Sequence, residues 1–177
     1  MSQQQPPAQA QPAGQRPSVV GEDIPSAPYP VNLKGIVSAG FGRGSKELGI
    51  PTANLPENVA EDFGKIVDTG IYYGWASVGG EETAKDVYPM VMSFGWNPYY
   101  KNQKRSAEVH IIHQYDRDFY NEELRVIVTG YIRAEKNYES LDALIDDIHT
   151  DIRVAQNSLE RPAYKALGSS PFLTNQK

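Results

Sequence analysis

The chain has 177 residues, of which 40% are hydrophobic and 22% charged, and its formal net charge is −5. This length suits one domain with its own core, and the composition is that of a globular protein with polar extensions. The acidic balance disfavours a general nucleic-acid binder, the absence of cysteine excludes disulfides and cysteine zinc sites, and no apolar run approaches the ~20 residues that cross a bilayer.

The first segment of the chain is rich in Gln, Pro and Ala. Residues 1–17 carry almost no large apolar side chain, so they cannot offset the entropy lost on ordering, and we expect them to be disordered. They lack the apolar run of a secretory signal and the arginine content of a transit peptide. We therefore expect a cytoplasmic protein, with a mitochondrial fraction left open. Residues 18–30, rich in proline, are expected to form an extended arm.

A loop with glycine at every second position from Gly40 to Gly44 follows a short apolar run. Glycine lets successive backbone N–H groups turn toward one anion, and Arg43 and Lys46 add two cations. The order Gly-Ser-Lys is not that of a Walker A loop, and serine replaces the third glycine of the dinucleotide fingerprint. From the loop alone, a phosphate site and a hairpin connection with solvated cations stay equally open.

The loop leads into the sequence Pro-Thr-Ala-Asn at 51–54. Proline fixes its own φ, and residues two apart in an extended chain point the same way, so Thr52 and Asn54 would present two neutral oxygens side by side. Such ligands are poor for a bare metal but suit Mg²⁺ that phosphates and waters already surround. The alternative is that both residues are ordinary turn formers.

Five runs rich in Val, Ile, Tyr and Thr and bounded by turn formers predict strands at 32–38, 70–78, 87–94, 107–115 and 124–132. No helical period interrupts them, which is typical of an antiparallel sheet closed into a barrel.

Apolar residues at three- and four-residue spacing then predict a helix from Leu141 to Leu159, with Ser140 as its N-cap and its apolar stripe on the barrel wall. The helix aspartates are expected to face solvent, with an acidic metal cluster as the alternative: Asp142, Asp146, Asp147 and Asp151. Beyond the helix, residues 161–177 form an extension that Tyr164, Leu167 and Phe172 attach in part.

Several motifs resemble those of one known family. Gly-Phe-Gly-Arg-Gly-Ser-Lys at 40–46 and Gly-Ile-Pro-Thr-Ala-Asn at 49–54 closely resemble the signature of riboflavin kinase. The similarity continues through Gly-Ile-Tyr-Tyr-Gly-Trp-Ala at 70–76, Gly-Trp-Asn-Pro-Tyr-Tyr-Lys-Asn at 95–102 and Glu-Val-His-Ile at 108–111. Several long motifs in the same order are far more specific than any single loop.

The resemblance implies a monofunctional enzyme of the eukaryotic type, which phosphorylates the ribityl 5′-hydroxyl of riboflavin with ATP to give FMN and ADP. Its implied cofactor is Mg²⁺, with Zn²⁺ or Mn²⁺ as alternatives. Pattern and resemblance together predict a mainly β fold, a closed antiparallel six-stranded Greek-key barrel with a long C-terminal helix, over residues 31–160. The expected partners are riboflavin or FMN and ATP or ADP, without nucleic acid or membrane, and the expected state is a monomer.

The resemblance also assigns roles to single residues. Glu108, near the start of the strand predicted at 107–115, takes the position of the catalytic base, and the alternative is a surface carboxylate. Thr52 and Asn54 would hold the metal, and Arg133 would bind the flavin. The nucleotide is assigned to Gly40, Gly42, Arg43, Gly44, Lys46, Lys104 and Ser106, although Lys104 equally suits a solvated hairpin tip.

The two histidines, His110 and His113, could suggest a metal pair. They lie on opposite faces of a strand, so hydrogen-bonded core or rim histidines are favoured over a metal site. A flavin-binding split-barrel oxidoreductase and a non-catalytic β-barrel interaction domain are the alternative functions, although neither needs the Thr52 and Asn54 pair.

Overall fold

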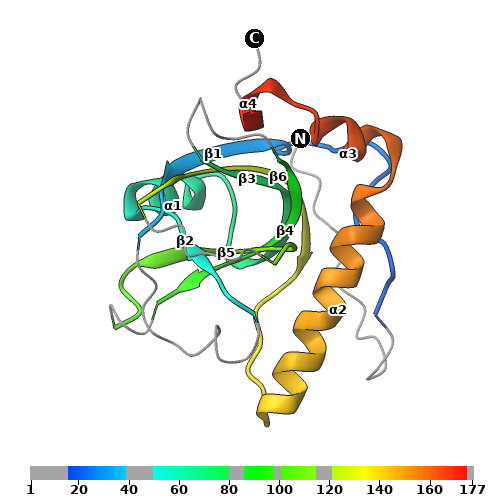
Figure 1. Ribbon diagram of the computed structural model, residues 1–177. Helices are drawn as coiled ribbons and strands as arrows, with labels where there is room; N and C mark the ends of the chain where they lie inside the picture. Colours follow the sequence, from blue (N-terminus) through cyan, green and yellow to red (C-terminus); the bar gives the residue numbers. More distant parts are fainter. Residues whose placement is uncertain (1–15, 39–49, 80–85, 98–100, 115–120, 175–177) are drawn as a thin grey trace.

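The structure, a computed structural model, describes residues 16–38, 50–79, 86–97, 101–114 and 121–174 (Figure 1). One antiparallel sheet has the strand order β1-β6-β3-β4-β5-β2. Its strands are β1 (Val31–Ile36), β2 (Ala53–Asn54), β3 (Gly70–Val78), β4 (Tyr88–Trp96), β5 (Arg105–Ile111) and β6 (Glu123–Arg133). The helices are α1 (Glu57–Gly64), α2 (Leu141–Leu159), α3 (Pro162–Leu167) and α4 (Pro171–Thr174).

The sheet curves around a core built from every second residue of its strands, as the alternation of side chains along a strand requires. Tyr72 and Ala76 of β3, Met92 of β4 and Val109 of β5 all belong to this inner cluster and are at most 2% exposed. The opposite face carries a second cluster, in which Ile71 and Val91 pack with residues of α2 and α3. The outer face of the sheet is therefore covered by helix rather than by solvent over this area.

The prediction of a closed barrel is wrong. The six strands form an open half-barrel: within the described part of the chain no ladder joins β1 to β2, and one isolated bridge links Ser38, beyond the end of β1, to Asn54. β2 has just two residues. Pro51 and Pro56 flank it, and proline has no N–H to extend a ladder. The prediction of a mainly β, antiparallel six-stranded sheet with a C-terminal helix is confirmed.

The sequence pattern predicts no helix before Leu141, but the structure has helix α1. It has only eight residues, starts after Pro56 and has no side-chain cap. Its Phe63 is fully buried and meets the rings of Tyr72 and Phe94 edge to face, at 5.3 and 5.0 Å between ring centroids. α1 thus contributes an aromatic side chain to the core beside the short strand β2.

Helix α2 has the predicted bounds, and Ser140 caps it by accepting a hydrogen bond from the N–H of Ala143 at 3.1 Å. The expectation that its four aspartates face solvent is wrong for two of them. Asp151 is 1% exposed, and Asp147 is partly buried. Among the described residues, no helix is long and apolar enough to span a bilayer.

The extension after α2 is attached by buried side chains. Tyr164 of α3 and Leu173 of α4 are at most 2% exposed. Phe172, which the sequence suggested as an attachment point, is partly buried, and its neighbour Leu173 is the fully buried residue. The Ser77 hydroxyl of β3 donates to the Leu173 carbonyl at 2.5 Å, and Arg125 of β6 donates to the Phe172 carbonyl at 3.0 Å. Strands of the sheet therefore hold α4 directly.

Candidate active site

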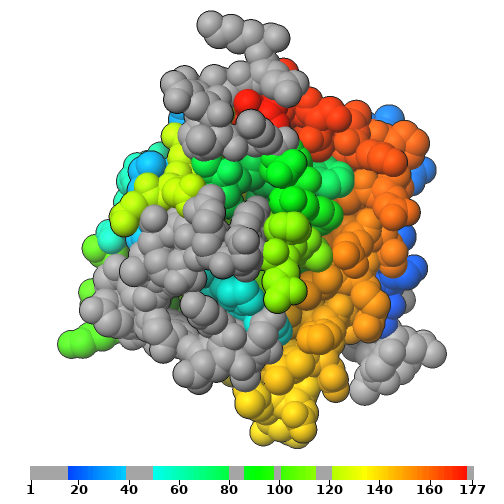
Figure 2. Space-filling model, in the orientation of Figure 1, coloured from blue at the N-terminus to red at the C-terminus, as the bar shows by residue number. Residues whose placement is uncertain are grey.

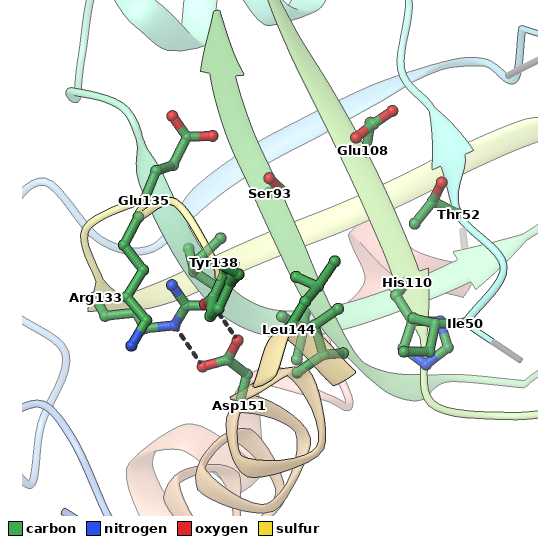
Figure 3. A pocket seen from close by; sticks show the side chains of 14 residues that line it. Ile50, Thr52, Ser93, Glu108, His110, Arg133, Glu135, Tyr138, Leu144 and Asp151 are labelled. Atoms are coloured by element: carbon green, nitrogen blue, oxygen red, sulfur yellow. Dashed lines mark hydrogen bonds and ion pairs between the residues drawn. The ribbon is translucent and has the colours of Figure 1, made fainter. Parts of the chain in front are cut away.

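A cavity of about 320 Å³ lies between the outer face of the sheet and α2 (Figure 3). Its walls come from segments far apart in the chain, the approach to β2, strands β3 to β6, the connection from β6 to α2, and α2 itself. The lining residues are Ile50, Thr52, Ile71, Val91, Ser93, Glu108, His110, Arg133, Glu135, Lys136, Tyr138, Leu144, Ile148 and Asp151.

The pairing of β2 with β5 brings the predicted acid and the predicted metal ligands together. Asn54 is the register partner of Glu108, and on the other side of β5 Glu108 is opposite Ser93 of β4. Along β5, Ala107 and Val109 are buried in the core, so Glu108 points to the other face. Thr52 and Glu108 both line the cavity (Figure 3). Residues about 55 positions apart in the sequence thus meet at one wall.

The Asn54 side chain is buried without a partner. The residue is 2% exposed, and among the described residues neither its Oδ1 nor its Nδ2 has a hydrogen-bond partner. A buried unsatisfied amide costs free energy, and such groups in native structures generally mark an absent water, ion or ligand. The described residues contain no group of three or more His, Asp or Glu side chains that could hold a metal. The donor set here, an amide and a hydroxyl near one carboxylate, suits a cation that shares most of its shell with phosphate and water.

His110 fixes the chain just before this donor set. Its Nδ1 is 2.8 Å from the Pro51 carbonyl oxygen. Because a carbonyl only accepts, Nδ1 carries the proton. Burial lowers the pKa of the imidazole, against the opposing effect of the hydrogen bond to Pro51, and so favours the neutral ring. The prediction of a hydrogen-bonded rim histidine is confirmed for His110, while the exposed His113 stacks on Tyr88 with ring centroids 3.8 Å apart.

Arg133 lines the other end of the cavity and is held by a buried acid. Its Nε and Nη2 donate to the two carboxylate oxygens of Asp151 at 2.9 and 2.8 Å (Figure 3). Burial alone would lower the pKa of the guanidinium, but the hydrogen bonds and charge of Asp151 raise it. The fork-to-carboxylate geometry fixes the plane of the arginine.

Two further side chains at this end were not found from the sequence. The Tyr138 hydroxyl donates to Asp147 at 2.5 Å. The Glu135 carboxylate lies so close to Gly95 that a Cβ there would come within 2.0 Å of Oε1. Burial and the negative charge of Glu108 raise the pKa of Glu135, while Arg133 opposes them. Gly95, the first residue of the motif at 95–102, was the sequence signal for this close approach.

The remaining predicted nucleotide residues lie away from the cavity as the described residues define it. Lys104 forms an ion pair with Glu57 at 2.6 Å, and the Ser106 hydroxyl accepts from Asn97 Nδ2 at 3.3 Å. Gly40, Gly42, Arg43, Gly44 and Lys46 are outside the described residues. The loop that contains them leaves at Ser38, which bridges to Asn54, and returns at Ile50, which lines the cavity. Both ends of the loop are therefore at the site.

Comparisons with known proteins point to one family. Residues 27–159 match the family model described as "Flavokinase: Riboflavin kinase". The chain is 48% identical to the riboflavin kinase of Pyricularia oryzae over 166 residues, covering 86% of this chain and 83% of that one. It is 51% identical to the riboflavin kinase of Homo sapiens over 148 residues, covering 84% and 93%.

A solved structure shows the same relationship. The crystal structure of riboflavin kinase from Trypanosoma brucei superposes with a TM-score of 0.64 at 27% identity, covering 82% of this chain and 86% of that one. The family match spans most of the chain, including both faces of the cavity. The chain therefore belongs to the riboflavin kinase family.

Proposed function

We infer that this chain transfers the γ-phosphate of ATP to the ribityl 5′-hydroxyl of riboflavin, giving FMN and ADP. The observation that carries the site assignment is the register of β2 and β5, which sets Glu108 opposite Asn54 and beside Thr52 at the wall of a cavity. The volume of about 320 Å³ is in the range of small-molecule sites.

The flavin is assigned to the part of the cavity next to α2. Ile71 and Val91 of the sheet and Leu144 and Ile148 of the helix give two apolar walls, which suit a flat aromatic ring system. Arg133, at the end of this space, would bind polar atoms of the ring. With the ring there, the ribityl chain extends toward Glu108 and Thr52.

Thr52 and Asn54 would hold a divalent ion, Mg²⁺ in our proposal, with Zn²⁺ and Mn²⁺ as alternatives. The buried and unpartnered amide of Asn54 fits this role. Such an ion would supply positive charge that neutralises the phosphates of the nucleotide. The Gly40 to Lys46 loop would supply backbone N–H groups and cations to the same phosphates, and Lys104, just before β5, and Ser106 of β5 would bind the nucleotide.

Glu108 orients the hydroxyl and takes its proton. A carboxylate cannot ionise an alcohol in advance, but phosphoryl transfer passes through a loose transition state in which the nucleophile needs little early deprotonation. Orientation therefore comes first and proton acceptance late. The raised pKa of Glu135 reflects in part its closeness to Glu108. We assign the enzyme small-molecule substrates only and a monomeric state.

The direct test uses wild-type protein with riboflavin, γ-labelled ATP and Mg²⁺. We expect label in FMN, one ADP for each FMN, and no reaction in excess EDTA. An analogue that lacks the 5′-hydroxyl, 5′-deoxyriboflavin, is the matched control, which should compete with riboflavin without accepting phosphate. Absence of FMN, or transfer of label to water alone, would refute the assignment.

A further inference from the structure

The N-terminal strap, residues 16–23, lies alongside α2, as the blue trace beside the orange helix shows (Figure 1). In the space-filling view its atoms lie against those of the helix (Figure 2). Val20 N–H donates to the Ser158 hydroxyl at 3.0 Å, and Arg161 donates to the Val20 carbonyl at 2.7 Å and to the next two carbonyls at 2.8 and 2.9 Å. The strap precedes residues 27–159, which match the family model.

Arg16, the first described residue of the strap, reaches the acids behind the flavin end of the cavity. Its Nη1 donates to Asp147 Oδ1 at 2.8 Å, and its Nη2 donates to Asp151 Oδ1 at 2.5 Å. The two aspartates are four residues apart on α2, so they lie one turn apart on the same face. One guanidinium fork can therefore bridge both, and the Arg16 side chain is only 23% exposed.

Each aspartate is held from two sides. Asp147 receives Arg16 on Oδ1, while its Oδ2 accepts from Tyr138 at 2.5 Å and has Lys136 at 3.4 Å. Asp151 receives Arg16 on Oδ1 and Arg133 on both oxygens. Among the described residues, Arg16 is the partner that the two aspartates have on the strap, whereas their other partners, Arg133, Lys136 and Tyr138, all line the cavity. The two acids thus connect the strap to the cavity wall.

We propose that Arg16 is a positioning residue of the flavin site, acting through Asp147 and Asp151 to set the orientation of Arg133. This inference rests on the proposed function, and it gives the strap a role in substrate affinity. With Arg16 present, the pair of acids has a cation on its outer side, and Arg133 binds Asp151 alone at short range while Asp147 is 3.8 Å away. Without Arg16, Asp147 loses its outer partner and draws Arg133 away from the cavity.

The test compares full-length Arg16→Gln, Arg16→Lys and Arg153→Gln with the wild type. Arg153 is the matched control, because it is an exposed arginine of α2 whose Nη2 donates, within the described part of the chain, only to Thr150 of the same helix. The measurements are the KM for riboflavin, the KM for MgATP and kcat, together with riboflavin Kd from quenching of flavin fluorescence and a thermal melt.

We expect Arg16→Gln to raise the riboflavin KM and Kd by roughly 2- to 30-fold, the range for residues that act through a neighbour. kcat and the KM for MgATP should stay within about twofold, because the phosphoryl end of the cavity is untouched. Arg16→Lys should recover part of the affinity, since it keeps the charge and loses the fork. Arg153→Gln should match the wild type.

A double-mutant cycle tests whether the effect of Arg16 passes through Arg133. If Arg16 acts through Arg133, then Arg16→Gln introduced into Arg133→Lys should change riboflavin Kd less than in the wild type. Equal effects in both backgrounds, an unchanged Kd, or a loss spread over kcat and both KM values would overturn the proposal, as would a melt showing that Arg16→Gln is unfolded. Failure of the wild type to form FMN would instead refute the proposed function.

Discussion

Replacing Asn54 by leucine should stabilise the metal-free protein while removing its response to nucleotide. Asn54 is 2% exposed, and among the described residues both polar atoms of its amide lack a partner. Leucine has a similar size and no polar atom to desolvate, and the strand pairing of β2 with β5 uses the backbone only.

The magnitude follows from the cost of an unsatisfied buried polar group, about 1–3 kcal/mol. We expect a gain of this size in the free energy of unfolding, and each kcal/mol corresponds to about 2–4 °C in Tm for a chain of this length. Native residues that are worse for stability than an apolar substitute are typical of functional sites.

The assay is a thermal melt in EDTA, repeated with Mg²⁺ and ADP. Asn54→Leu should melt higher than the wild type in EDTA, and only the wild type should gain stability on addition of MgADP. The matched control is Asn58→Leu, at an exposed position of α1, which should leave both melts unchanged. If Asn54→Leu melts lower than the wild type in EDTA, the amide is satisfied in the free protein and the reasoning fails.

Three further predictions concern single contacts. Gly74→Ala should lower the free energy of unfolding, measured by urea titration, by about 3 kcal/mol or more, because the new Cβ would lie 1.8 Å from a backbone oxygen of β6. Gly95→Ala should lower it much less, because the Cβ there meets the end of the Glu135 side chain, which can move. Asp147→Asn should destabilise the protein near pH 6. Burial alone would raise the pKa of the Asp147 carboxyl, but the hydrogen bond from Tyr138 and the surrounding cations together lower that pKa below its ordinary value of 3.8. Because the folded-state pKa is the lower one, that stabilisation is present above the unfolded pKa, so the difference from the wild type should shrink as an acid titration falls below pH 3.8. His110→Ala should reduce kcat/KM for MgATP about fivefold, since it removes one hydrogen bond of ~1 kcal/mol that holds the chain next to Thr52, and an unchanged value would contradict that role.

Local sequence patterns were enough to predict where the long elements lie. The apolar spacing of α2 and the β-branched and aromatic run of β3, bounded by turn formers, predict their bounds to the residue, because both signals lie in the local sequence. Short elements carry too little pattern. α1 has eight residues without a side-chain cap, and β2 has two between prolines, so neither the helix nor the open edge of the half-barrel could be predicted.

The site residues also fall into those that the sequence predicts and those whose contacts only the fold sets. The motifs point to Glu108, Thr52 and Asn54 as separate residues, but their meeting depends on the register of β2 and β5, which only the folded sheet sets. Asp151 looks like a solvated helix residue because a carboxylate is rarely buried without a partner. Its burial comes from Arg133 and Arg16, which reach it from 18 and 135 positions away. Contacts at such separation leave no local pattern.

The central claim is that Glu108 accepts the proton of a hydroxyl held beside Thr52 and Asn54. The most direct measurement is the single-turnover rate of FMN formation by Glu108→Gln at saturating riboflavin and MgATP. We predict a rate about 10²–10⁴-fold below the wild type, the typical share of general-base assistance, with riboflavin Kd within about twofold. A variant that forms FMN at the wild-type rate would contradict the account.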